Sequence, residues 1–99
     1  MKKYILNNGV EIPGIGFGTW RIPGGEDSLK ATLEAIEVGY RHIDTAALYE
    51  TEESVGKAVR ACGIPRDELF VTSKVWLADR GYDKAMKACE ASLKALNMD

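Results

Sequence analysis

The sequence contains little of what several classes of binding site require. Of its 99 residues one is histidine and two are cysteine, and Cys62 and Cys89 form no Cys-x-x-Cys pair. A zinc site of the usual cysteine and histidine kind is therefore not expected. Both cysteines fall on apolar faces of predicted helices, so we expect them to be small buried side chains of a protein in the reducing cytoplasm.

Long apolar runs and an excess of one charge are also missing. The net charge is −2, which offers no electrostatic attraction to nucleic acid or to an anionic membrane. The apolar stretches are only a few residues long, too short to span a bilayer or to form the apolar region of a signal peptide. The hydrophobic share of 45% and the charged share of 28% are ordinary. We expect residues 1–99 to form a single domain.

Hydrophobic periodicity predicts an N-terminal hairpin followed by alternating strands and helices. The hairpin consists of residues 4–6 and 10–12, joined by Asn7-Asn8-Gly9, because Asn-Gly suits a turn with positive φ at both central positions. Strands that alternate with helices form a parallel sheet with right-handed crossovers. Such a sheet is either open or closed into a barrel, and periodicity leaves both possible. The further predicted elements are strands over 14–19, 40–45 and 69–76, and helices over 27–38, over 52–61 and from 82.

Each predicted helix has one apolar face that we expect to be buried. Thr51 is the expected N-cap of the second helix, and Gly39 and Gly63 are the expected residues just beyond the first and second helices. The three apolar faces are Leu29, Leu33, Ala35 and Ile36; Val55, Ala58, Val59 and Cys62; and Tyr82, Met86, Cys89, Leu93 and Leu96.

The glycine-rich segment 14–19 lacks the spacing of a classical dinucleotide-binding loop. The Rossmann fingerprint requires G-x-G-x-x-G directly before a helix. Counted from Gly14 the sixth residue is Thr19, and counted from Gly16 it is Arg21. The predicted helix also begins several residues later. We therefore interpret the glycines as small residues that allow the first strand to pack closely against its neighbours.

Three polar side chains fall where parallel strands are predicted to end. Asp44 lies at the end of its strand, Tyr49 lies in the following loop, and Lys74 lies near the end of the next strand. Ligands bind at this edge of a parallel sheet. A free tyrosine, with a pKa of about 10, is a weak proton donor at neutral pH. A neighbouring ammonium lowers that pKa, and the ammonium itself needs a counter-ion such as Asp44. The trio could therefore donate a proton to a carbonyl oxygen as hydride arrives at carbon.

Structural roles for the same residues stay open at this stage. An aspartate at a strand end can cap the next turn, a lysine there can be solvated, and Tyr49 can belong to the core. His42 shares strand parity with Asp44, so both side chains point to the same face. We interpret His42 as a structural histidine.

Several motifs, in order and at matching spacing, resemble the aldo-keto reductase family. The segment GYRHIDTA at 39–46, followed by Tyr49, Glu52, Val55 and Gly56, is similar to the signature of that family. The segments GFGTW at 16–20 and TSKVW at 72–76 are similar to its flanking motifs. The resemblance runs over nearly the whole chain. It implies an α/β fold of the (β/α)8 TIM-barrel type, of which this chain would be a partial barrel: the N-terminal hairpin and three βα units.

The same resemblance implies an oxidoreductase that uses NADPH to reduce aldehydes and ketones to alcohols, with NADH as an alternative cofactor. Tyr49 would be the general acid, Lys74 would lower its pKa, and Asp44 would pair with Lys74. The residues that match cofactor contacts near the nicotinamide and its ribose are Gly18, Thr19 and Asp44, and those that match an apolar substrate pocket are Trp20, Leu48 and Trp76.

The sequence departs from the family pattern in one small and one large respect. Thr51 stands where the family commonly has asparagine, and both residues can cap a helix. The catalytic histidine of the family belongs to the fourth strand, whereas the one histidine here, His42, lies on the second. A complete barrel also takes about 250 residues. We therefore expect little or no activity from the 99-residue chain alone.

The alternative interpretation is a truncated, catalytically silent βα module. A three-stranded parallel sheet leaves two open edges, which favour pairing with another chain. If the chain ends at Asp99, we expect it to fold by self-association as a homo-oligomer.

Overall fold

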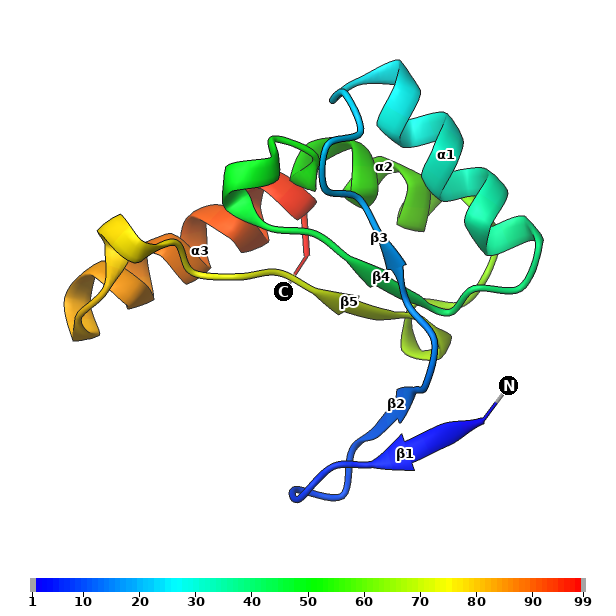
Figure 1. Cartoon of the computed structure of the whole chain (residues 1–99), viewed down its shortest axis with the longest axis horizontal. Coiled ribbons are helices and arrows are strands. Elements are labelled where there is room, and N and C mark those ends of the chain that lie inside the picture. The colour runs from blue at the N-terminus through cyan, green and yellow to red at the C-terminus, as the bar shows by residue number, and fades with distance from the viewer. Residues whose placement is uncertain (1, 99) are drawn as a thin grey trace.

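The structure, a computed structural model, describes residues 2–98 and consists of an N-terminal hairpin followed by three βα units (Figure 1). The predicted types and order of the elements are confirmed. The strands and helices are β1 (Lys3–Ile5), β2 (Glu11–Pro13), β3 (Phe17–Gly18), α1 (Glu26–Glu37), β4 (His42–Asp44), α2 (Glu52–Ala61), β5 (Phe70–Thr72) and α3 (Tyr82–Leu96). Short 3₁₀ helices are η1 (Ala47–Tyr49), η2 (Arg66–Glu68) and η3 (Leu77–Asp79).

The hairpin turns through a three-residue loop rather than through a two-residue turn. The backbone N–H of Leu6 donates to the carbonyl oxygen of Val10 at 2.8 Å. Within the loop only Gly9 adopts a positive φ, of 86°. The expectation of positive φ at both central positions is therefore wrong, because a three-residue loop needs the left-handed conformation only at its last residue. Figure 1 shows the hairpin beside the N-terminal end of the parallel sheet.

The three remaining strands form a parallel sheet in the order β3-β4-β5. Gly18 pairs with Asp44, and Asp44 pairs with Thr72, so the carboxyl ends of all three strands meet at one edge. The strands are shorter than their apolar runs predict. In the run 14–19, for example, only Phe17–Gly18 pair, and Ile15 is 60% exposed. Helices α1 and α2 cover one face of the sheet (Figure 1).

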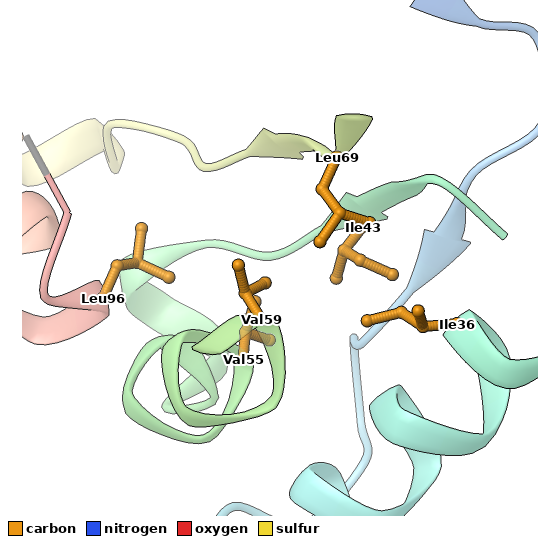
Figure 2. Packing of buried hydrophobic residues seen from close by; sticks show 6 residues of the cluster. All are labelled: Ile36, Ile43, Val55, Val59, Leu69 and Leu96. Carbon is orange, nitrogen blue, oxygen red and sulfur yellow. The ribbon is translucent and has the colours of Figure 1, made fainter. Parts of the chain in front are cut away.

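The core lies between the sheet and α2, and α1 and α3 each contribute one residue to it (Figure 2). At its centre Ile43 of β4 and Val55 of α2 are completely buried. Burial of such side chains stabilises the fold by roughly 1.5–3 kcal/mol each. The six residues of this cluster are Ile36, Ile43, Val55, Val59, Leu69 and Leu96.

Helix α1 buries only part of its predicted apolar face, of which Ala35 and Ile36 are buried as expected. Ser28 and Thr32 are completely buried, whereas Leu29 and Leu33 are only half-buried. The leucines line shallow grooves beside α2, and the small side chains of Ser28 and Thr32 face inward. The expectation of Leu29 and Leu33 as core residues is therefore wrong, because the position of α2 rather than the apolar pattern sets which side of α1 is buried.

Most of the apolar face of α3 is exposed. Tyr82 is 82% and Met86 50% exposed, Cys89 is also exposed, and Leu96 alone in α3 is fully buried. The expected burial of the cysteines is thus wrong for Cys89, and Cys62 is half-buried. In Figure 1 the first turns of α3 extend away from the sheet and from α1 and α2, and η3 lies beside them. No described helix is both long enough and apolar enough to cross a bilayer.

Candidate active site

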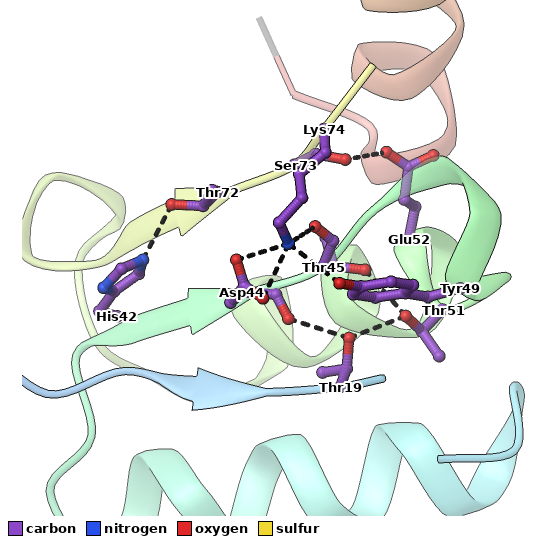
Figure 3. A network of polar contacts seen from close by, with 10 residues as sticks. All are labelled: Thr19, His42, Asp44, Thr45, Tyr49, Thr51, Glu52, Thr72, Ser73 and Lys74. Carbon is purple, nitrogen blue, oxygen red and sulfur yellow. Dashed lines mark hydrogen bonds and ion pairs between the residues drawn. The ribbon is translucent and has the colours of Figure 1, made fainter. Parts of the chain in front are cut away.

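Asp44, Tyr49 and Lys74 meet at the edge where the parallel strands end (Figure 3). Asp44 is the last residue of β4, and Tyr49 is the last residue of η1 in the loop that follows. Lys74 lies two residues beyond the end of β5. Because neighbouring parallel strands end at the same edge, two separate βα units bring these side chains together.

The Lys74 ammonium is the centre of this group. Its Nζ atom donates to both carboxylate oxygens of Asp44 at 2.8 Å, to the backbone oxygen of Thr45 at 3.1 Å and to the phenol oxygen of Tyr49 at 3.2 Å. An ammonium has no acceptor, so the phenol oxygen must accept. The hydroxyl hydrogen of Tyr49 therefore stays free to be donated to another group.

These surroundings raise the pKa of Lys74. Burial lowers the pKa, because it penalises the charged ammonium, but the hydrogen bonds and Coulomb attraction of Asp44 and Tyr49 outweigh burial. The amine is therefore protonated at neutral pH. The side chains of Lys74 and Asp44 are 43% and 31% exposed, so the group is open to a ligand from the solvent side.

Thr51 occupies the N-cap position of α2 without capping the helix through its side chain. Its Oγ1 atom lies 2.9 Å from Oγ1 of Thr19 and 2.8 Å from Oγ1 of Thr45. All three threonines are completely buried. The expectation of a side-chain cap is therefore wrong, because the hydroxyl turns toward the strand ends and away from the helix N–H groups.

Glu52, the first residue of α2, is a buried carboxylate that the sequence indicates only as part of a motif. It is 7% exposed, and its Oε2 atom accepts a hydrogen bond from Oγ of Ser73 at 2.6 Å (Figure 3). Ser73 directly precedes Lys74. Two features of the sequence indicate that both residues lie near the site. Glu52 follows the loop that contains Tyr49, and Ser73 lies beside Lys74.

The predicted cofactor contacts differ in how accessible they are. Gly18 is exposed, and open space lies where a side chain would begin. Thr19 has no exposed surface, and its hydroxyl donates to the backbone oxygen of Asp44 at 3.0 Å. Direct contact between Thr19 and a cofactor therefore requires the end of β3 to move, and the contact stays a prediction.

The three predicted substrate-pocket residues follow the ends of the three parallel strands. Trp20 is 61%, Leu48 49% and Trp76 44% exposed, so each offers apolar surface near the site. Their role also stays a prediction. His42 lies deeper, where its Nε2 atom is 2.8 Å from Oγ1 of Thr72, in keeping with a structural histidine. Among residues 2–98 no group of three or more histidine, cysteine, aspartate or glutamate side chains could hold a metal ion.

Comparison with known proteins identifies the family. The sequence model of the Aldo/keto reductase family matches residues 14–99. The chain belongs to this family. It is similar to glyoxal reductase from Bacillus subtilis, with 46% identity over 94 residues that cover 95% of this chain and 34% of that protein.

Solved structures of aldo-keto reductases show the same fold. An aldo/keto reductase from Brucella melitensis superposes with a TM-score of 0.94 and 45% identity, over 99% of this chain and 38% of that one. The aldo-keto reductase of Bombyx mori, solved in complex with NADP, gives a TM-score of 0.89 and 42% identity over 99% of this chain and 35% of that one. The chain thus spans about a third of the length of its relatives. The predicted partial barrel, of the (β/α)8 type, is confirmed.

Proposed function

We propose that the chain carries the acid–base groups of a nicotinamide-dependent reductase that converts aldehydes and ketones to alcohols, with Tyr49 as the proton donor. The observation that carries this proposal is the position of Lys74 Nζ, 2.8 Å from both carboxylate oxygens of Asp44 and 3.2 Å from the phenol oxygen of Tyr49. Family membership supports carbonyl reduction as the reaction.

The geometry suits proton donation from Tyr49 Oη to a carbonyl oxygen. Because the phenol oxygen accepts from Lys74, the phenol hydrogen can point toward a substrate. When that proton leaves, the ammonium already lies where it stabilises the new phenolate. Asp44 holds the ammonium in place from the other side. A general acid of this kind contributes about 10²–10⁴ in rate.

The residues present fit the nicotinamide end of NADPH, which when bound would supply the hydride. Gly18 ends β3 beside Asp44, and the absence of a side chain there would allow a flat ring to approach the backbone. Trp20, Leu48 and Trp76 would provide apolar walls for the substrate. The Bombyx mori relative was solved with NADP, which supports NADPH over NADH as our proposed cofactor.

A chimera tests this proposal. This chain would replace the matching third of the Bacillus subtilis glyoxal reductase, and NADPH consumption would be followed with glyoxal as the substrate. We expect the chimera to turn over and its Tyr49→Phe variant to lose about 10²–10⁴ in kcat/KM. Tyr82→Phe is the matched control, because Tyr82 is 82% exposed on α3. A folded chimera in which Tyr49→Phe retains full activity would contradict the proposal.

We propose as a second candidate that the 99-residue chain by itself is catalytically silent and folds by self-association. The observation that favours it is exposed apolar surface: Leu77 is 59% and Tyr82 82% exposed. Multi-angle light scattering of the isolated chain should show a dimer or larger species, and mixing it with NADPH and glyoxal should give no turnover. A monodisperse monomer that unfolds cooperatively would overturn this candidate.

The two cysteine thiols indicate the cellular compartment of the protein. Cys62 and Cys89 are both free in the structure. Free thiols suit a reducing compartment, and we propose the cytoplasm. Fractionation that places the protein in an oxidising compartment would count against this location.

A further inference from the structure

We propose that Thr51 and Glu52, two consecutive residues at the start of α2, are positioning residues that hold the ends of all three parallel strands. They would thereby fix Asp44, Tyr49 and Lys74 in one arrangement. The importance of this arrangement rests on the proposed function, but the hydrogen bonds that create it can be tested without catalysis.

The three buried threonine hydroxyls form a chain of hydrogen bonds with one direction. Thr19 Oγ1 must donate to the backbone oxygen of Asp44, because a carbonyl can only accept. The single hydroxyl hydrogen of Thr19 is then used, so Thr51 donates to Thr19 across 2.9 Å. By the same argument Thr45 donates to Thr51 across 2.8 Å. Each hydroxyl therefore donates once along the order Thr45, Thr51, Thr19 and Asp44.

This chain of hydrogen bonds joins two strand ends to the start of α2. Thr19 follows β3, and Thr45 follows Asp44 at the end of β4. The Asp44 carbonyl oxygen accepts both the N–H and the hydroxyl of Thr19, each at 3.0 Å. Thr45 is held by Thr51 through its hydroxyl, while its carbonyl oxygen accepts from Lys74 at 3.1 Å. Thr51 thus supports the backbone of Asp44 and Thr45, whose carboxylate and carbonyl oxygen, respectively, accept hydrogen bonds from Lys74.

Glu52 holds the third strand end. Its carboxylate accepts from Ser73 Oγ at 2.6 Å, and Ser73 lies between the end of β5 and Lys74. Hydrogen bonds to a carboxylate are short and stronger than neutral ones. A buried carboxylate that lost this partner would be left with an unsatisfied charge. The bond therefore fixes the backbone from which the Lys74 side chain extends.

Glu50, the residue between Tyr49 and Thr51, links the position of Thr51 to that of the Tyr49 phenol. Glu50 adopts a left-handed conformation with φ of 60°, an unfavourable one for a residue with a side chain. Its carbonyl oxygen lies against Gly24, where an added Cβ atom would come within 2.7 Å. Such a conformation persists only when the surroundings hold it. The buried Thr51 follows Glu50 directly, and Lys74 Nζ lies 3.2 Å from the phenol oxygen of Tyr49, so we infer that this loop holds Tyr49 toward Lys74.

Competitive acylation of lysines, read by mass spectrometry, tests the inference on the 99-residue chain without cofactor or substrate. Lys74 should react slowly in the wild type, because Asp44 and Tyr49 hold it protonated. In Thr51→Val and Glu52→Ala we expect its reactivity relative to the exposed Lys30 to rise about three- to tenfold, as the free-amine fraction follows its pKa. Asp44→Asn removes the counter-ion and should therefore show the largest rise in Lys74 reactivity.

Two matched controls separate positioning from general damage. Thr51→Ser keeps the hydroxyl, and Glu53→Ala removes an adjacent acid whose side chain is 75% exposed. In both variants we expect Lys74 to be acylated as slowly as in the wild type. If Glu52→Ala fails to fold, Ser73→Ala decides, because it removes the same bond from the half-buried strand end.

Unchanged Lys74 reactivity in folded Thr51→Val and Ser73→Ala would overturn the inference. Since labelling needs no turnover, a rise in Lys74 reactivity together with a folded chimera whose Tyr49→Phe variant retains full activity would refute only the proposed function.

Discussion

Buried hydroxyl groups in this protein differ in whether they have a hydrogen-bond partner. Those of Thr19, Thr45 and Thr51 are linked to one another near the site. Those of Ser28 and Thr32, on the buried face of α1, have no hydrogen-bond partner among the described residues. A buried polar group without a partner costs about 1–3 kcal/mol, whereas a partnered one adds to stability. Replacing threonine with valine should therefore raise the free energy of unfolding on the buried face of α1 and lower it near the site.

Thr32→Val should raise the free energy of unfolding by about 1 kcal/mol, because it replaces an unpartnered hydroxyl with a methyl group of the same shape. Thr51→Val should lower it by about 1–3 kcal/mol, because Thr45 loses its acceptor and Thr19 loses a donor. Urea unfolding followed by circular dichroism measures both. Changes of the same sign in the two variants would contradict this assignment.

The Lys74–Asp44 pair should give stability that disappears at high pH. Asp44 and Tyr49 raise the pKa of Lys74 above its ordinary value of 10.5, so the folded chain binds this proton more tightly than the unfolded chain does. The contribution is then complete below 10.5 and is lost as the pH rises through the higher folded-state pKa.

The urea midpoints of the wild type and of Lys74→Met, measured between neutral and strongly alkaline pH, check this dependence. The difference between them should stay constant to about pH 10 and then shrink. Lys57→Met serves as the control, because Lys57 forms only an exposed pair with Glu53 at 3.3 Å. A difference that grew with rising pH would contradict the sign.

At the scale of elements, the junction between α2 and α3 depends on a glycine. A Cβ atom added at Gly56 would overlap the backbone of Leu96, including its carbonyl oxygen. That oxygen also accepts a hydrogen bond from Arg60 Nη1 at 2.7 Å. The two helices can therefore approach this closely only while residue 56 has no side chain.

Gly56→Ala should separate the end of α3 from α2 and lower the free energy of unfolding by about 1–3 kcal/mol, the usual range for overpacking. The loss should occur although alanine favours helix more than glycine does. Denaturant unfolding measures the change, and exposed Lys57→Ala on the same helix should have little effect. A stabilised Gly56→Ala variant would show that the helices can move apart without cost.

At the scale of the whole molecule, the first half of α3 presents an apolar face to solvent. Tyr82, Met86 and Cys89 are exposed at helical spacing. If the isolated chain self-associates as we propose, this face is the surface expected to be covered.

Met86→Lys should shift the mass measured by light scattering toward the monomer, because it places a charge on that face. Glu90→Gln changes the net charge by the same amount at another exposed position of α3 and should leave the mass unchanged. An equal shift in both variants would point to net charge rather than to the apolar face.

Local pattern predicted the elements better than it predicted their packing. The bounds of α2 agree with the expected 52–61, and Gly63 adopts the positive φ expected beyond its end. The exposed part of α3 and the half-buried leucines of α1 differ from expectation. A hydrophobic stripe gives the face that can be buried, whereas burial itself requires a neighbouring element on that side.

The sequence by itself determined the order of strands and helices, the family, and the placement of Asp44, Tyr49 and Lys74 at strand ends. These depend on local periodicity and on motif spacing, which short segments carry. Only the tertiary structure decided that Thr51 faces the strand ends instead of capping its helix, and that Glu52 bonds to Ser73. Both contacts join segments whose separation in space depends on the whole sheet and the helix packed against it, so no local pattern could reveal them.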